Sequence, residues 1–191
     1  LILFITSILT LALNIQPVKA SGNIYNGDWL YRKAHNLTGS TEGYQAYYQM
    51  KVIVHYGNGI DSGENVYLNS HSQTDFDDIR FTWYNSSSGS EVECDYWLEE
   101  KHDQDSATFW IEIPEISNVT DNTIYVYFGN STVSTTSNGD NTFLFFDDFD
   151  NVNLPEWTIM DDAYISRTVE NSYIKFTGTN VPEEFHEEVL Y

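Results

Sequence analysis

Three aspartates within four positions are the strongest candidates for chemistry in this sequence. Asp75, Asp77 and Asp78 crowd the entry of a segment with alternating apolar residues. Calcium is a hard cation that takes several oxygen ligands, so these carboxylates predict a calcium site, with Asn69 or Asp61 as helpers. The spacing is not that of an EF-hand loop, which needs a D-x-[DN]-x-[DN]-G run and a distal Glu. The alternative is that Asp78 makes a cross-strand pair with Arg80 or caps a turn.

A second group of carboxylates, Asp147, Asp148 and Asp150, lies further along the chain. It combines the same hard oxygen ligands within a few residues and is a second candidate calcium site. Calcium is therefore the one cofactor that the sequence predicts.

Acidic residues also alternate along residues 93–99. Glu93, Asp95 and Glu99 are expected to share one strand face with Trp97, because side chains two positions apart point the same way. Retaining glycosidases hold their two carboxyl groups about 5 Å apart, and an E-x-D-x-E or E-x-D-x-x-E run on one strand provides this. Here the last Glu stands one residue further along. The spacing therefore argues against catalysis, and a solvated strand face is the alternative.

Two tryptophans fall on the polar side of their predicted strands. Trp97 and Trp110 could stack on sugar rings, while Glu93 and Asp95 would bind hydroxyl groups. These four residues are the predicted ligand-binding set, with a carbohydrate as the ligand. The alternative is that the tryptophans pack beneath a loop or between domains.

The excess of acidic residues argues against polyanionic partners. The chain has 8 Lys and Arg against 29 Asp and Glu, a formal net charge of −21, so we expect no nucleic acid and no adhesion to anionic lipid. The five His residues form no zinc motif, and no nucleophile elbow, P-loop or dinucleotide fingerprint is present. Cys94 is the single cysteine and is predicted to be a buried core thiol.

The beginning of the chain looks like an export signal. Residues 1–13 are almost wholly apolar, and Val18-Lys19-Ala20 resembles a small-residue cleavage site. Residues 1–20 are therefore predicted to be a secretory signal peptide cut short at its N-terminus, which places the protein in the secreted or cell-surface class. Any membrane contact is expected only through this segment or through regions outside the sequence.

The rest of the chain alternates with a period of two and shows no helical period. Short runs between Gly, Asn, Asp and Ser clusters predict an all-β fold, an antiparallel, jelly-roll-like β-sandwich, over residues 25–142. A second, incomplete β-sandwich is predicted over residues 143–191, with short strands around 157–159 and 173–176. Residues 131–141 have no apolar period and are expected to be a linker or a long loop.

The clearest strands define two faces each. Ile79, Phe81 and Trp83 alternate with polar residues, which predicts a strand buried on one face. Residues 48–56 are a second strand with Met50, Val52 and Val54 inward. Further strands are predicted at residues 29–33, 66–68, 91–98, 108–113 and 124–128. In the strand at 91–98, the even-numbered residues should face the core and the odd-numbered ones solvent.

Four blocks in this order resemble a known family. WLYRK at residues 29–33, DDIRF at 77–81, FWIEIP at 109–114 and IYVYFGN at 124–130 are similar to the YRK, DIRF, WVxVP and YxYYGN blocks of domain-of-unknown-function family 2341. The departures are mild, such as Phe128 in place of a Tyr.

The resemblance implies a location and a fold. Members of this family are exported bacterial and archaeal surface proteins of no established activity, and a concanavalin A-like (laminin-G-like) sandwich often follows. FDDF at residues 146–149, followed by Trp157, is similar to the first strand of such a lectin-like domain, which often holds calcium nearby.

Three functions follow as alternatives. The first is a non-enzymatic surface module that binds a carbohydrate or another cell-surface ligand, assisted by calcium. The second is a structural spacer or adhesion domain of a surface or envelope assembly, and the third is a glycoside hydrolase. An exposed aromatic patch with acids favours the first, fully packed aromatics favour the second, and a cleft with two carboxylates favours the third.

Overall fold

The computed structural model describes residues 16–17, 25, 28–86, 88–119, 121–150 and 165–178. The chain divides into two compact units, residues 1–143 and residues 144–191. No helix among the described residues is long and apolar enough to cross a membrane.

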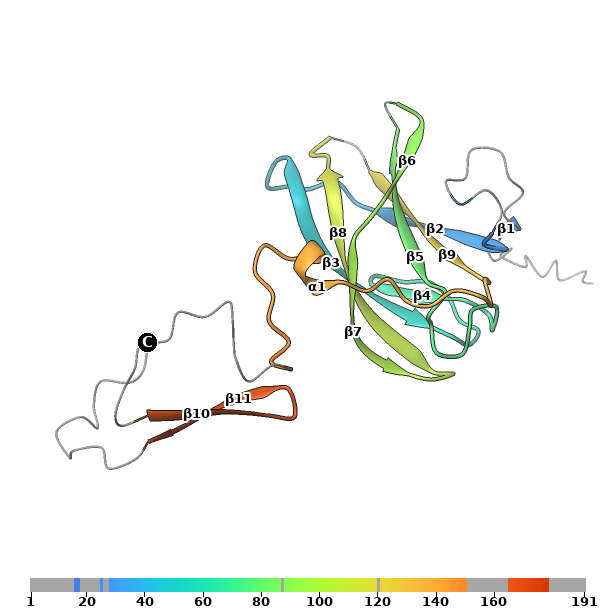
Figure 1. Ribbon diagram of the computed structural model, residues 1–191. Coiled ribbons are helices and arrows are strands. Elements are labelled where there is room, and N and C mark those ends of the chain that lie inside the picture. Colours follow the sequence, from blue (N-terminus) through green and yellow to red (C-terminus); the bar gives the residue numbers. More distant parts are fainter. Residues whose placement is uncertain are drawn as a thin grey trace, which may run out of the picture. The chain divides into compact units, whose positions relative to one another are not determined.

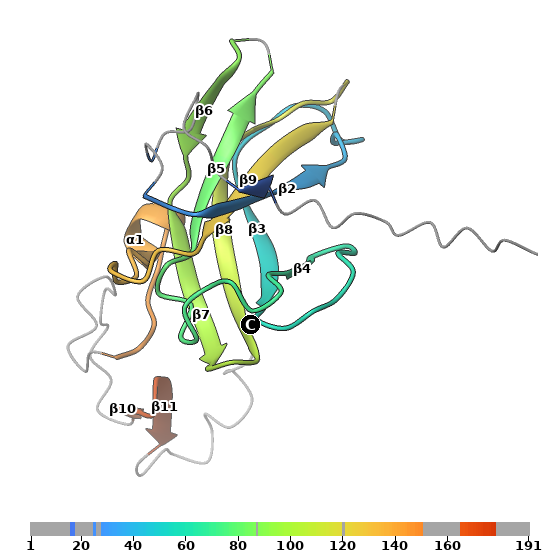
Figure 2. The same cartoon turned by 90° about the vertical axis from the view of Figure 1, so that its right-hand side faces the viewer.

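The first unit is a sandwich of two β-sheets (Figures 1 and 2). Sheet A has five strands in the order β1–β2–β9–β5–β6, and sheet B has four in the order β4–β3–β8–β7. Neighbouring strands run antiparallel except β3 and β4, which are parallel. The strands are β1 (Gln16–Pro17), β2 (Tyr31–Leu37), β3 (Gln45–His55), β4 (Asn65–Tyr67), β5 (Arg80–Asn85), β6 (Ser90–Glu93), β7 (Tyr96–His102), β8 (Ser106–Ile116) and β9 (Asn122–Phe128). The all-β sandwich predicted from the sequence is confirmed.

The core lies between the sheets and is supplied by alternate residues of each strand. In β3, Val52 and Val54 are fully buried and Met50 packs against the core, as the alternation predicts. Each fully buried apolar side chain stabilises the fold by roughly 1.5–3 kcal/mol. The largest fully buried side chains of this core are Phe76, Phe81, Phe109, Phe128, Leu68, Ile79, Ile111, Ile113 and Ile124.

The chain changes sheets between β6 and β7. The prediction of one strand over residues 91–98 is wrong, because the strand breaks at Cys94 and Asp95. The Cys94 amide donates to Phe81 O in sheet A at 2.9 Å, and Asp95 O accepts from Glu112 N in sheet B at 2.9 Å. Cys94 is buried as predicted, and burial raises the pKa of its thiol to about 12.

The same side of the sandwich is closed by residues 129–138, which we call the closing segment. Its amides and hydroxyls bind β7: Asn138 N donates to Tyr96 O at 2.8 Å, and Thr136 N donates to the Tyr96 hydroxyl at 2.9 Å. Ser137 Oγ accepts from Leu98 N at 2.7 Å. The stretch predicted as a linker or long loop is thus a loop fixed against the sandwich. Polar residues serve this role because each hydrogen bond replaces a missing strand partner.

The strand β5 is buried on both faces, which corrects the prediction of a half-buried strand. Arg80 and Thr82 lie on the outer face of sheet A and are nevertheless buried. The indole of Trp29 covers Arg80: the Arg80 guanidinium lies 5.4 Å from the Trp29 ring, and Trp29 Nε1 donates to Asp78 O at 2.5 Å. The hydroxyl of Thr82 donates to Glu91 on the same face. A residue fifty positions away therefore hides a face that looks solvated in the sequence.

Within its described residues, the second unit holds one antiparallel hairpin, β10 (Ile165–Glu170) and β11 (Tyr173–Gly178). The strand predicted around residues 173–176 is confirmed. The strand predicted at 157–159 lies outside the described residues, as does most of the predicted signal segment. Gln16 and Pro17 of that segment pair with Arg32 and Tyr31 as β1.

Candidate functional site

Asp78 is a structural anchor at the entry of β5. Its carboxylate is fully buried and accepts three backbone amides: Gln73 at 2.9 Å, Gly129 at 2.5 Å and Asn130 at 3.1 Å. Burial raises the pKa of the Asp78 carboxyl, and the amide donors oppose that rise. Both oxygens are thus occupied by the protein's own backbone. These contacts are those expected of the alternative to calcium binding, in which Asp78 caps a turn.

The other two acids of this cluster face a lysine. Asp77 Oδ1 lies 3.2 Å from Lys101 Nζ, and the same ammonium donates to Asp75 O at 2.9 Å. Asp75 Oδ1 accepts from Asp77 N at 3.3 Å. Asp61, a suggested helper, is held at 2.7 Å by Lys33. Over the part of the chain that the structure describes, no three His, Cys, Asp or Glu side chains gather as a metal site needs.

The second acidic group forms local turns in the second unit. Asp147 Oδ1 accepts from Phe149 N at 2.8 Å, and Asp148 Oδ1 accepts from Asp150 N at 3.1 Å. Asp150 in turn accepts from Ser172 Oγ at 2.5 Å. Calcium binding by either acidic group stays a prediction.

Calcium should raise the melting temperature by several degrees if it binds only the native state, because mass action then stabilises that state. The measurement is a thermal melt in chelator and in millimolar calcium. The variant Asp77→Asn separates the two groups, since it removes a carboxylate from the first and leaves Asp147 and Asp148 unchanged. Identical melts in both conditions would leave both groups as turn formers.

The predicted sugar-stacking pair is partly covered. Trp97 and Trp110 are direct cross-strand partners on the outer face of sheet B, and both are half-buried. Phe143, next to the short helix α1 (Gly139–Thr142), packs on them with ring centroids 5.9 Å from Trp97 and 6.1 Å from Trp110. Trp110 Nε1 donates to Glu99 Oε2 at 3.0 Å. These contacts agree with the alternative in which the tryptophans pack beneath a neighbouring segment. Sugar binding by the two rings stays a prediction.

The two acids predicted to accompany the tryptophans lie elsewhere. Glu93 belongs to sheet A, where it accepts from the Tyr25 hydroxyl at 2.8 Å, whereas Trp97 belongs to sheet B. Asp95 is exposed at the crossover between the sheets. The expected shared face of Glu93, Asp95, Trp97 and Glu99 is therefore wrong, because the break at residues 94–95 moves the chain from one sheet to the other.

The outer face of sheet A carries a polar network that sequence reasoning missed. The side chain of Glu91 is only 5% exposed; it pairs with Arg32 and accepts from Tyr127 Oη at 2.5 Å and from Thr82 Oγ1 at 3.1 Å. The neighbouring Val92, predicted to face the core, is 46% exposed. The expected exposures of these two neighbours are inverted. Glu91 is held by Arg32, Tyr127 and Thr82, while Val92 lies on the β5–β6 hairpin, which extends beyond the other strands (Figure 1).

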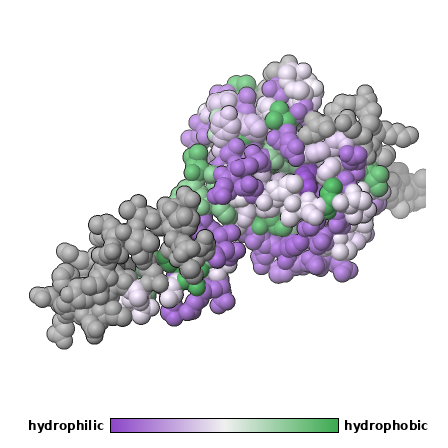
Figure 3. All heavy atoms as spheres, in the orientation of Figure 1, coloured by the Kyte–Doolittle hydropathy of each residue, from purple (hydrophilic) through white to green (hydrophobic). Residues whose placement is uncertain are grey.

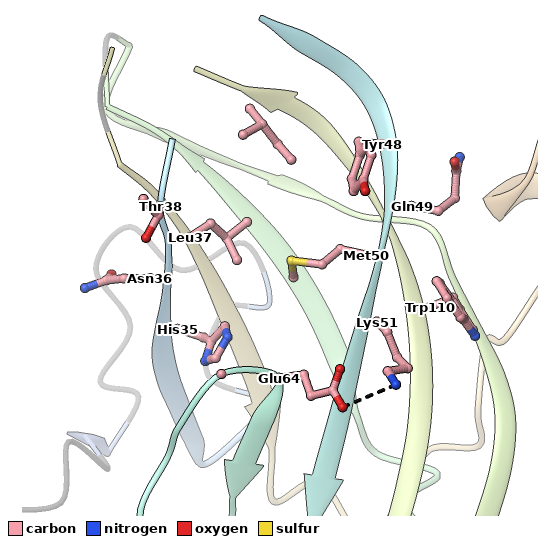
Figure 4. Close-up of a pocket in the computed structure, with 12 residues that line it drawn as sticks. His35, Asn36, Leu37, Thr38, Tyr48, Gln49, Met50, Lys51, Glu64 and Trp110 are labelled. Carbon is pink, nitrogen blue, oxygen red and sulfur yellow. Dashed lines mark ion pairs between the residues drawn. The ribbon is translucent and has the colours of Figure 1, made fainter. Parts of the chain in front are cut away.

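A groove of about 420 Å³ opens between β2 of sheet A and β3 of sheet B (Figure 4). It exists because β4 covers β3 only at residues 53–55, and β1 covers β2 only at residues 31–32. Leu37 and Met50 point toward one another across it (Figure 4). Together with Ile116, which also lines the groove, they form its apolar floor. Pockets of this size are typical of small-ligand sites. This groove is the best candidate for a binding site in the described residues of the first unit.

The rim of the groove is polar. His35, Asn36 and Thr38 come from β2 and its end, and Lys51 pairs with Glu64 at 3.2 Å across the lower end. Tyr48 is 51% exposed and presents its ring to the groove (Figure 4), and Trp110 also contributes to the lining. Burial lowers the pKa of His35. The groove thus combines an aromatic surface with neutral and charged hydrogen-bonding groups.

The model of a family described as "Domain of unknown function (DUF2341)" matches residues 75–160. No curated protein and no solved structure matches the chain. The match supports the resemblance to this family from the second block, DDIRF, onward. It covers β5 to β9 and the closing segment, whereas most of the groove is built by residues 35–64. The family description assigns no activity.

Proposed function

We propose that this protein is an exported, non-enzymatic binding module and that the groove between β2 and β3 holds its ligand. The observation that carries the proposal is the groove itself, an apolar floor beneath a polar and aromatic rim. Export rests on the apolar segment at residues 1–13 and on the resemblance to surface proteins. The net charge of −21 and the mostly hydrophilic face drawn in Figure 3 agree with an extracellular setting.

Carbohydrate, the ligand class predicted from the sequence, is part of this proposal. Tyr48 offers a ring for stacking, and Asn36 and Lys51 offer donors for hydroxyl groups. The proposed sugar site thereby moves from the Trp97–Trp110 face to the groove. The proposal also includes a lectin-like second domain and assistance by calcium, and both rest on the sequence.

The other two functions find less support. Glycosidases need two carboxyl groups across one bond, and Glu64 is the one carboxylate among the twelve residues that line the groove. A structural spacer is the second candidate, because Phe143 covers the Trp97–Trp110 pair as in a packed face without a ligand. Release of reducing ends from a polysaccharide that disappears in Glu93→Gln would instead promote the hydrolase.

Replacing Tyr48 with alanine should weaken glycan binding by roughly 1–3 kcal/mol if its ring is an anchor. The measurement is a glycan array on the full chain, with and without calcium, followed by titration of any glycan retained. Tyr173→Ala is the matched control, since that tyrosine is 74% exposed in the second unit. Equal losses in both variants would contradict a sugar site in the groove.

A further inference from the structure

The groove side of β3 is an unpaired strand edge. Residues 53 and 55 use this edge to bond the chain around β4: Ile53 N donates to Glu64 O at 2.8 Å, and His55 O accepts from Leu68 N at 2.9 Å. Backbone groups alternate between the two edges of a strand, so the amides and carbonyls of Gln49 and Lys51 point to the same side. Within the described residues, no strand or loop pairs with them there.

An unpaired strand edge has free backbone groups that favour binding of another backbone. Two residues offer two N–H donors and two C=O acceptors in the spacing of a strand, which an extended polypeptide matches and a sugar does not. A lysine often protects such an edge by its charge. Here Glu64 neutralises Lys51 at 3.2 Å, so this protection is weakened.

The groove also has room for the side chains of a strand added along β3. A strand laid along β3 would continue the line of β4 and point every second side chain between the two sheets. Leu37, Met50 and Ile116 would receive these side chains, because they already form an apolar floor between β2 and β3. The backbone pairing and the apolar contacts therefore require the same occupant.

The charges around this edge select a cationic occupant. Glu42 precedes β3, and Glu112 and Glu115 lie one strand behind this edge, on β8, where they pair with Gln49 and Ala46. With Glu64 they outnumber Lys51, the one cation on this stretch of β3. A second copy of this chain would bring a further net charge of −21 to the contact, which opposes self-association.

We propose that the free edge of β3 binds an extended, cationic segment of a partner protein, which adds as a strand beside β4. This inference rests on the proposed function and names the partner of the same groove. The partner segment alternates apolar residues, which enter the groove, with Lys or Arg residues, which meet the flanking carboxylates.

The test measures binding of synthetic peptides to the full chain. The probes alternate Val or Leu with Lys, and the matched probes carry Glu in place of Lys. Two further versions are N-methylated at alternate residues, on one edge or on the other. We expect the Lys peptides to bind, the Glu peptides to fail, and one of the two methylated versions to lose roughly tenfold or more, because only one edge of the peptide faces β3.

The matched protein variants are Lys51→Pro and Lys51→Ala. Proline removes the edge amide at a position where strands tolerate it, whereas alanine keeps the amide and removes only the charge. Lys51→Pro should therefore lose peptide binding and Lys51→Ala should keep it. If thermal melting shows that Lys51→Pro is unfolded, Met50→Glu replaces it by placing a charge on the groove floor.

The outcomes separate this inference from the proposed function. Peptide binding that ignores both N-methylation and Lys51→Pro would overturn strand addition. A glycan that binds in the groove, in the absence of any peptide that does, would overturn the peptide partner and leave the binding module intact. Failure of peptides and glycans alike would overturn both.

Discussion

Replacing Asp78 with alanine should destabilise the first unit by about 3–5 kcal/mol, the range expected when a buried, hydrogen-bonded carboxylate is removed. Its two oxygens accept the amides of Gln73, Gly129 and Asn130, and all three donors would be left without that acceptor. The loss also frees the start of the closing segment from the entry of β5. Gly129 has a left-handed φ of +89°, and only glycine fits there because a Cβ would lie 2.6 Å from the Tyr31 ring.

The measurement is urea unfolding of the full chain, followed by intrinsic tryptophan fluorescence. Asp77→Ala is the matched control: its carboxylate is partly exposed and pairs with Lys101, so its loss should cost less than about 1 kcal/mol. Asp78→Asn should resemble alanine more than wild type, because its amide group would face a backbone donor. Equal, small losses in Asp77→Ala and Asp78→Ala would show that Asp78 is not an anchor.

The strands whose apolar and polar residues alternate are predicted correctly from the sequence. The period of two in β3 places Val52 and Val54 in the core, and the same period identifies β8 and β9. These predictions succeed because one face of each strand packs against the opposite sheet, so the apolar pattern and the burial coincide.

The failures have a different physical origin. The break at residues 94–95 depends on which sheet edges lie next to each other, and the alternation of residues continues unchanged across it. The burial of Arg80 depends on Trp29, which is distant in the sequence. The groove depends on where β1 and β4 stop, which is a property of strand lengths and not of any motif. None of these features has a signal within a short window of sequence.

Asp75, Asp77 and Asp78 show how one motif can divide. The three acids look equivalent in the sequence, yet one is a buried anchor and another pairs with a lysine from β7. The three acids differ because of their positions at the start of β5. The side chain of Asp78 points toward the amides of the two residues that follow β9, whereas Asp75 and Asp77 lie in the preceding turn.

Glu91→Ala should destabilise the fold by about 2–4 kcal/mol, although the residue looks like a solvated strand position in the sequence. Its side chain accepts from Arg32, Tyr127 and Thr82, and these three donors come from three different strands of sheet A. Removing the carboxylate leaves the hydroxyl groups of the two buried residues and the guanidinium of Arg32 without their shared acceptor. Tyr127 is fully buried, and burial together with the hydrogen bond to Glu91 raises the pKa of its hydroxyl.

Glu93→Ala is the control for this prediction, because Glu93 lies two residues away on the same face but is exposed. Unfolding in urea should show a loss well below that of Glu91→Ala. A double-mutant cycle with Tyr127→Phe then isolates the hydroxyl–carboxylate pair, and a coupling energy of about 1 kcal/mol or more is expected for residues in one hydrogen-bond network. If the two glutamate variants unfold alike and the cycle gives no coupling, the covered face of sheet A is held by its aromatic rings, and the acid between them is dispensable.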